Sequence, residues 1–179
     1  MVDELLQNDI IEESISSYAS PILLVSKKTG GQRLCVDYRA LNRRTLKDHF
    51  PLPLIEDQID QLSGSKYFTC LDLTSGYYQI PVKADCRHLT AFITPNGLYQ
   101  FKRVPFGLVN APSVFQRTIT KALALKSPRI DPDNLIGKPA LAYMDDLIVA
   151  SKTFDEGLKK LEKTFDLLNG ANLTLNLKK

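Results

Sequence analysis

Hydrophobic and polar residues alternate along the first third of the chain in patterns that predict helices and a hairpin. A short helix is predicted over residues 2–11. Residues 20–41 predict two strands joined by a Gly-Gly turn with basic residues at its tip. Residues 51–64 predict an amphipathic helix that ends at Gly64. Its apolar stripe comprises Leu54, Ile55, Ile59 and Leu62.

Three further segments predict strands. Residues 66–73 are rich in β-branched and aromatic side chains, so they predict a buried strand that closes at Asp72. Residues 89–104 predict a second hairpin around the turn Pro95-Asn96-Gly97. Residues 141–151, LAYMDDLIVAS, predict a third hairpin whose turn contains two aspartates.

Two longer amphipathic helices complete the pattern. Residues 110–125 predict a helix with Asn110 as N-cap and Pro112 in the first turn. The second is predicted over residues 154–170 and ends at Gly170. The inward faces are expected to comprise Val114, Phe115, Ile119, Ala122 and Leu123 in the first helix and Leu158, Leu161, Phe165 and Leu168 in the second. A loop at 127–139 and a final strand at 173–177 are also predicted. Hairpins interspersed with helices favour an α+β fold over a doubly wound parallel sheet.

Composition narrows the class of protein. The 179 residues can bury one core with a small subdomain attached, and 44% hydrophobic with 24% charged residues is typical of a soluble globular protein. The sequence contains no apolar run near the roughly 18 residues of a membrane-spanning helix. Three cysteines and two histidines indicate neither a disulfide framework nor a zinc site. A reducing, intracellular setting fits these counts best.

The positive charge is concentrated in one segment. Residues 26–47 contain seven basic residues and one acidic residue, Asp37, so this segment has a net charge of +6 within a chain of net charge +3. The basic residues are Lys27, Lys28, Arg33, Arg39, Arg43, Arg44 and Lys47. A local basic patch suggests a phosphate-bearing partner, and a merely solvated charged face is an equally weighted alternative.

Three aspartates at strand ends suggest a cation site. Aspartate is common in turns for structural reasons, but a turn needs only one, and adjacent Asp145 and Asp146 repel each other. If the strand that ends at Asp72 lies beside the third hairpin, Asp72 and Asp145 converge. Carboxylate oxygens without His or Cys suit Mg²⁺, and two ions about 3.5–4 Å apart would serve phosphoryl or nucleotidyl transfer.

Four long blocks then match a known family in order. They are RLCVDYRALNRRTLKDHFPLP, YFTCLDLTSGYYQIPV, TAFITPNGLYQFKRVPFGLVNAPSVFQR and YMDDLIVAS. Together they resemble the reverse transcriptase of long-terminal-repeat retroelements, in particular gypsy-type retrotransposons. The resemblance implies a right-hand polymerase fold in which an antiparallel palm sheet packs on helices. It assigns the fingers to approximately 1–64 and 82–111, and the palm to approximately 65–81 and 112–179.

The resemblance also implies roles for individual residues. The catalytic and metal-binding set comprises Asp72, Asp145 and Asp146, with the backbone carbonyl of Leu73 on one of two Mg²⁺ ions, for which Mn²⁺ could substitute. The nucleotide-binding set comprises Lys28, Arg33, Ser75, Gly76, Tyr77, Phe106 and Gly107. The template-primer set comprises Pro112, Tyr143 and Met144. In this family Tyr77 matches the steric gate against a ribose 2′-OH, although Tyr77 and Phe106 could also be plain core aromatics.

The expected function is therefore RNA-directed DNA polymerisation, with an RNA or DNA template-primer and dNTPs as partners. The family continues with a thumb, a connection region and a ribonuclease H domain, which are expected in the remainder of a Pol polyprotein and not in this chain. The expected location is the cytoplasm or a virus-like particle. Two alternatives are a truncated or domesticated remnant that binds nucleic acid without catalysis, and an RNA-templated RNA polymerase, against which Tyr77 argues.

Overall fold

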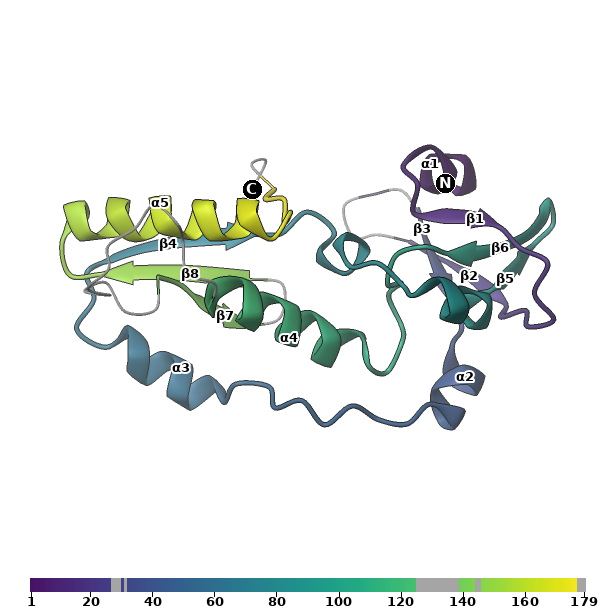
Figure 1. Ribbon diagram of the computed structural model, residues 1–179, viewed down its shortest axis with the longest axis horizontal. Coiled ribbons are helices and arrows are strands. Elements are labelled where there is room, and N and C mark those ends of the chain that lie inside the picture. The colour runs from purple at the N-terminus through teal and green to yellow at the C-terminus, as the bar shows by residue number, and fades with distance from the viewer. Residues whose placement is uncertain (27–29, 31, 125–138, 144–145, 177–179) are drawn as a thin grey trace. The chain divides into compact units, whose positions relative to one another are not determined.

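The structure is a computed structural model that describes residues 1–26, 30, 32–124, 139–143 and 146–176. The chain divides into two compact units (Figure 1). Unit 1 comprises Met1–Asp48 and Tyr77–Ala111, and unit 2 comprises His49–Gly76 and Pro112–Lys179. Strands and helices occur in both units and the strand ladders are antiparallel, which confirms the predicted α+β class. None of the helices in the described ranges is both long and apolar enough to span a membrane.

Unit 1 is built on a three-stranded sheet in the order β1-β6-β5. Its strands are β1 (Ile11–Glu13), β6 (Gly97–Phe101) and β5 (Phe92–Thr94), so the second predicted hairpin is confirmed. The short helix α1 (Val2–Gln7) ends four residues before its predicted end, because Asp9 adopts a φ of +56° and the chain enters β1. The core of unit 1 comprises Ile11, Tyr38, Phe92, Tyr99 and Phe101.

A two-stranded ribbon and short helices complete unit 1. Strands β2 (Ile22–Ser26) and β3 (Gln32–Val36) pair antiparallel, as the first predicted hairpin requires. Helix α2 (Arg39–Arg44) follows β3, and the 3-10 helices η1 (Gly76–Gln79) and η2 (Ala84–Thr90) precede β5. These three short helices have no counterpart in the sequence prediction, since each is too short to show a period.

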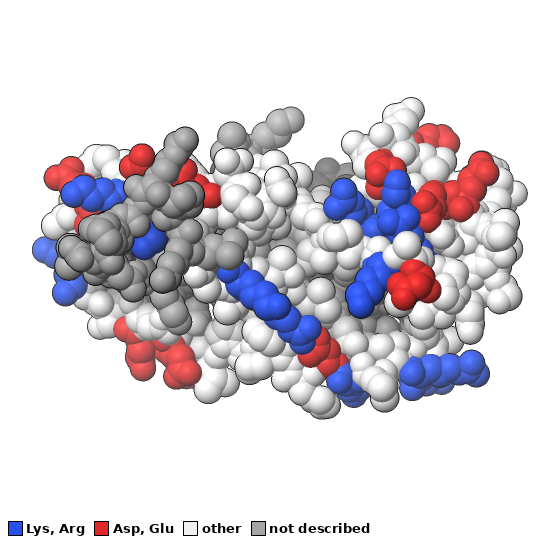
Figure 2. Space-filling model, in the orientation of Figure 1, with Lys and Arg blue, Asp and Glu red and all other residues white. Residues whose placement is uncertain are grey.

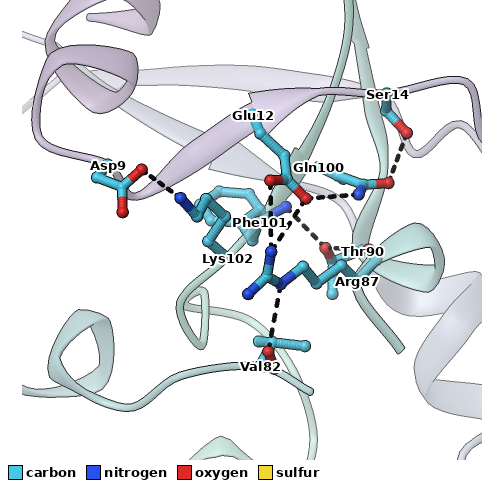
Figure 3. Close-up of polar contacts among 9 residues, drawn as sticks. All are labelled: Asp9, Glu12, Ser14, Val82, Arg87, Thr90, Gln100, Phe101 and Lys102. Atoms are coloured by element: carbon cyan, nitrogen blue, oxygen red, sulfur yellow. Dashed lines mark hydrogen bonds and ion pairs between the residues drawn. The ribbon is translucent and has the colours of Figure 1, made fainter. Parts of the chain in front are cut away.

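A polar network fastens β1 to its neighbours (Figure 3). Glu12 on β1 accepts a hydrogen bond of 2.8 Å from the amide of Gln100 on β6, and its carboxylate lies 3.4 Å from the guanidinium of Arg87 on η2. Lys102 pairs with Asp9, and this contact lowers the pKa of the Asp9 carboxyl. On the face of the molecule that Figure 2 shows, basic and acidic side chains of unit 1 lie next to one another.

Unit 2 contains the second three-stranded sheet, in the order β4-β8-β7. Its strands are β4 (Tyr67–Asp72), β8 (Asp146–Ser151) and β7 (Leu141–Tyr143), all antiparallel. Helix α5 (Phe154–Gly170) lies along β4 and β8 (Figure 1). Helix α4 (Ala111–Ala124) contacts the sheet through Gln116, whose amide donates a 3.2 Å hydrogen bond to the carbonyl of Ala142 on β7. The third predicted hairpin is therefore present, although its turn residues lie outside the described ranges.

Several predicted helix faces agree with the structure only in part. Phe115, Ile119 and Ala122 of α4 are buried as expected. Helix α3 (Ile55–Leu62) forms and Gly64 follows it at a φ of +76°, but most of the predicted apolar stripe is exposed, with Ile59 at 59%, and only Leu62 is half-buried. Strand β4 was predicted to be buried, and this is wrong: residues 67–70 are exposed because β4 is an edge strand.

Two other expectations are also corrected. Leu158 and Phe165 of α5 are exposed, whereas Leu168 is buried as expected, together with Thr164 and Leu167 of the same helix. The predicted final strand is reduced, in the part of it that is described, to a single bridge between Leu73 and Leu175. The predicted loop at 127–139 lies outside the described ranges except for Pro139.

Candidate functional site

The site residues predicted from the sequence fall into two groups, one in each unit. In unit 2, Asp72 is the last residue of β4 and Asp146 is the first residue of β8. The two are direct cross-strand partners in the antiparallel ladder, so their side chains project from the same face of the sheet. Tyr143 on β7 is the partner of Asp146 on the other side. Met144 and Asp145 lie outside the described residues.

The carboxylate face is the one opposite α5. Along β8, the side chains of Leu147, Val149 and Ser151 lie on the face opposite to Asp146. These three residues are at most 2% exposed. A Cβ atom on Gly157 of α5 would lie 2.8 Å from Ser151 Oγ, which places the helix on that buried face. The polar residues Asp72 and Asp146 therefore project away from the helix, where a charged ligand can approach.

Asp72 is also held from its second side by the segment that follows α5. The amide of Asn176 donates a 3.1 Å hydrogen bond to Asp72 Oδ2. The two backbones are joined as well, because the Asn176 N–H donates to the Asp72 carbonyl at 2.8 Å and the Thr74 N–H donates to the Thr174 carbonyl at 3.1 Å. Sequence reasoning missed Asn176, although the alternation in LTLNL placed it opposite the leucines.

The donor chemistry of this pair suits a hard divalent cation. Both residues offer carboxylate oxygens on neighbouring strands, the donor type that Mg²⁺ prefers. Among the residues that the structure describes, no group of three or more His, Cys, Asp or Glu side chains is arranged to hold a metal. The third carboxylate of the predicted set, Asp145, lies outside those residues.

The turn after β4 contains three more predicted residues. Leu73 is buried at 3% exposure and pairs with Leu175, so the backbone at this point is fixed. Ser75 has a φ of +46°, which is uncommon for a residue other than glycine, and its side chain is exposed. Gly76 is buried at the start of η1. Residues 73–76 thus form a turn that follows Asp72 directly in the sequence.

In unit 1, the structure brings Tyr77 and Phe106 together. Their ring centroids are 4.9 Å apart with an interplanar angle of 68°, an edge-to-face contact. Tyr78 contacts Phe106 in the same manner at 5.3 Å. Phe106 is 44% exposed and Tyr77 is half-buried, so neither ring is an ordinary fully buried core residue. Gly107 follows with a φ of +94°, a conformation that favours glycine.

The structure describes only part of the remaining predicted site residues. The backbone of Arg33 pairs with Val25 in the β2–β3 ribbon, while its side chain and the whole of Lys28 lie outside the described part of the structure. Pro112 is the second residue of α4, in the first turn as predicted. Arg39, one of the basic residues of the 26–47 segment, is paired with Asp37 at 2.6 Å.

Comparison with known proteins identifies the relatives of the chain. The sequence model of the family described as reverse transcriptase (RNA-dependent DNA polymerase) matches residues 25–179. The Pol polyprotein of transposon 412 from Drosophila melanogaster is 44% identical over 99% of the chain, and that of transposon gypsy is 36% identical. The Tf2-3 polyprotein of Schizosaccharomyces pombe is 35% identical. The chain spans 14%, 17% and 12% of the lengths of these three relatives.

Comparison with solved structures also finds reverse transcriptases. The foamy viral protease-reverse transcriptase in complex with double-stranded DNA matches 99% of the chain with a TM-score of 0.85 and 28% identity, and 29% of that structure's chain is covered. Its complex with an RNA/DNA hybrid matches equally well, with 22% of its chain covered. These matches confirm the predicted fold class and the predicted family resemblance.

Proposed function

The chain belongs to the reverse transcriptase family, and on that premise we propose that it forms the fingers and palm of an RNA-directed DNA polymerase. The proposed reaction is the attack of a primer 3′-OH on the α-phosphate of a dNTP, directed by an RNA or DNA template. Unit 1 corresponds to the fingers and unit 2 to the palm. The units differ from the expected fingers and palm ranges at two places: residues 49–64 belong to unit 2 and residues 77–81 to unit 1.

One observation supports this function above all others. Asp72 and Asp146 end and begin neighbouring strands as direct cross-strand partners, on the sheet face that α5 leaves uncovered. Two carboxylates opposite each other repel, so this pairing costs stability unless a cation or another donor compensates it. A structural role in the sheet would be served better by an apolar or oppositely charged pair. The arrangement therefore favours a site for cations and the phosphates they accompany.

The residues present fit the two Mg²⁺ ions on which the proposed reaction depends. Asp72, Asp145 and Asp146 would supply carboxylates and Leu73 a backbone carbonyl, with Mn²⁺ as a possible substitute. When bound, such ions neutralise charge on the phosphates and favour ionisation of the attacking hydroxyl. The amide of Asn176 restrains Asp72 Oδ2, which reduces the number of orientations that the Asp72 carboxylate can adopt.

The other residues bind and select the nucleotide. Arg33 and Lys28 provide positive charge for the triphosphate, and only the Arg33 guanidinium can bind two phosphate oxygens in a fork. Ser75 and Gly76 offer backbone N–H groups to the phosphates. Tyr77 excludes a ribose 2′-OH, because its ring is braced edge-on by Phe106 and so resists displacement. Gly107 gives the nucleotide close access to backbone.

Template and primer complete the proposed assembly. Pro112 in the first turn of α4 is assigned to the template, and Tyr143 and Met144 are assigned to the primer terminus. The foamy viral relatives have been solved in complex with double-stranded DNA and with an RNA/DNA hybrid, which supports a nucleic-acid duplex as the partner. Because the relatives are transposon polyproteins, we place the reaction in the cytoplasm or in a virus-like particle. A non-catalytic binding remnant is less favoured, since all three predicted acidic residues are present.

The test is primer extension by the protein expressed in its natural reading frame. Asp72→Asn and Asp145→Asn should each reduce extension with Mg²⁺ by at least about a hundredfold. Asp60→Asn is the matched control, because Asp60 is an exposed aspartate of α3 in the same unit. Retention of wild-type extension by both site variants would exclude the metal-ligand assignment. Salt-sensitive duplex binding without any extension by the wild type would favour the binding remnant.

A further inference from the structure

An asparagine that sequence reasoning did not select contacts the loop that contains Phe106 and Gly107. Asn42 lies on α2, and its amide Nδ2 donates a 2.8 Å hydrogen bond to the Gly107 carbonyl. Its Oδ1 accepts a 2.9 Å hydrogen bond from the Val109 N–H. One side-chain amide therefore satisfies both a backbone acceptor and a backbone donor, two residues apart, on the same loop.

Helix α2 is a firm support for this contact. Its N-cap residue Tyr38 is 2% exposed in the core of unit 1, and the Tyr38 hydroxyl donates a 2.8 Å hydrogen bond to the Thr90 carbonyl. Leu41, the neighbour of Asn42, packs against the same core. The Asn42 N–H donates to the Tyr38 carbonyl at 2.7 Å. The position of Asn42 is thus restrained by the buried N-cap residue Tyr38 and by the half-buried Leu41.

The far end of the loop is fixed in the same way. Asn110 Oδ1 accepts a 3.0 Å hydrogen bond from the Asp48 N–H, and its Nδ2 donates a 2.8 Å hydrogen bond to the Leu46 carbonyl. Leu108, which lies between the two loop residues that Asn42 contacts, packs against the core of unit 1. Residues 107–110 are therefore held at three successive points, which is more restraint than an ordinary surface connection has.

The restraint continues to the aromatic pair. Phe106 immediately precedes the clamped residues, and its ring contacts Tyr77 edge-to-face at 4.9 Å and Tyr78 at 5.3 Å. Because Phe106 is 44% exposed, packing around it is incomplete and its position depends on the backbone that follows. A shift of the loop at Gly107 would move the Phe106 ring and remove the edge-on support of Tyr77.

We propose that Asn42 is a positioning residue for nucleotide selection: its amide fixes the loop 106–109, and the loop fixes the Phe106 ring that supports Tyr77. This inference rests on the proposed polymerase function, in which Tyr77 excludes the ribose 2′-OH. Asparagine is required at position 42 because the contact needs one donor and one acceptor on a short side chain. Aspartate has the same shape but no donor, and it would set a carboxylate oxygen against the Gly107 carbonyl.

The experiment compares Asn42→Asp and Asn42→Ala with the wild type in the protein's natural reading frame. The expected result is a fall of about tenfold in the preference for dNTP over ribonucleotide, with a higher KM for dNTP, because a small misplacement of a positioning group is costly. The matched control is Asn8→Asp, since the Asn8 amide also donates to a backbone carbonyl in unit 1 but lies at the end of α1. It should leave the preference unchanged.

The sugar preference separates a positioning role from a merely structural one, and hydrogen exchange reports whether the contact itself is lost. The sugar preference is a ratio, so it does not change when a variant only lowers the fraction of folded protein. Hydrogen exchange of the Val109 N–H should accelerate in Asn42→Ala, because Asn42 Oδ1 is its acceptor. Normal extension with an unchanged sugar preference in both Asn42 variants would overturn the inference while leaving the proposed function intact. Failure of the wild type to extend a primer would instead overturn the proposed function.

Discussion

Gly157 lies where helix α5 packs on strand β8, and an alanine at this position tests how closely the two elements approach. A Cβ atom on Gly157 would lie 2.8 Å from Ser151 Oγ and 3.7 Å from Ser151 Cβ. Ser151 is 2% exposed, and its hydroxyl donates a 2.9 Å hydrogen bond to the Thr153 carbonyl. The Oγ atom can therefore move away only by giving up this bond. Strand β8 begins with Asp146, so its placement matters for the candidate site.

Two effects of opposite sign determine the outcome of Gly157→Ala. Helix propensity alone would stabilise the protein by about 0.5–1 kcal/mol, because glycine inside a helix loses more backbone entropy than alanine. Overpacking against a buried atom costs about 1–3 kcal/mol. Loss of the Ser151 hydrogen bond adds about 0.5–1.5 kcal/mol. The packing terms are larger, so the free energy of unfolding should fall by about 1–3 kcal/mol.

The effect of Gly157→Ala on the free energy of unfolding should change sign when Ser151 Oγ, the obstructing atom, is removed. In a Ser151→Ala background the nearest atom of residue 151 to the new methyl group is the Cβ at 3.7 Å, an ordinary contact distance. There, Gly157→Ala should raise the free energy of unfolding by about 0.5–1 kcal/mol. Urea unfolding of the wild type, both single variants and the double variant measures this coupling. Gly170→Ala is the control, because a Cβ there would meet no atom within 4 Å. Equal effects of Gly157→Ala in the two backgrounds would refute the steric reasoning.

Three further predictions concern the site and the stability of unit 1. Tyr77→Ala should lower the preference for dNTP over ribonucleotide in primer extension by at least about tenfold, and an unchanged ratio would exclude the gate. Asn176→Ala should raise the Mg²⁺ concentration for half-maximal extension by about tenfold, since a partner that orients the Asp72 carboxylate is lost, and an unchanged Mg²⁺ dependence would contradict this. Hydrogen bonds from Arg39 lower the pKa of Asp37 from 3.8 to about 2. The contribution of these bonds to the free energy of unfolding is therefore fully present above pH 3.8 and is lost as the pH falls toward 2. Asp37→Asn should remove that part of the pH dependence of urea unfolding, and a superimposable pH profile for wild type and variant would refute it.

The local sequence was sufficient to predict the elements that frame the candidate site, and to select Asp72 and Asp146. Each of these aspartates interrupts an apolar run at the end of a predicted strand, which is a pattern visible without any tertiary information. That they are cross-strand partners depends on strand order and register, which local patterns do not encode. Asn42 and Asn176 could not be selected, because their importance lies entirely in which backbone or carboxylate they meet across 65 and 104 residues of sequence.

Strand β4 shows how an apolar composition can mislead. YFTCLD predicts burial because aromatic and β-branched residues are typical of interior strands. In the structure, Tyr67 and Phe68 are 48% and 54% exposed, and among the described strands β4 lies at the edge of its sheet with β8 as its ladder partner. Composition gives the propensity for a strand, whereas position within the sheet decides burial, and only the first of these can be predicted from one sequence.

Helix α5 shows that the buried face of a helix is also difficult to predict from one sequence, and its packing on β8 gives the physical reason. Of the predicted inward stripe, Leu168 is buried, but Leu158 and Phe165 are exposed, and the face that meets the sheet also contains Gly157 and Thr164. Gly157 and Thr164 are seven residues apart and so share one face of the helix. A hydrophobicity count gives them little weight, yet the absence of a side chain on Gly157 allows α5 to approach β8 where Ser151 is buried. The face of a helix that meets a sheet is thus selected by shape as well as by hydrophobicity, and the Gly157 and Ser151 variants measure the contribution of shape directly.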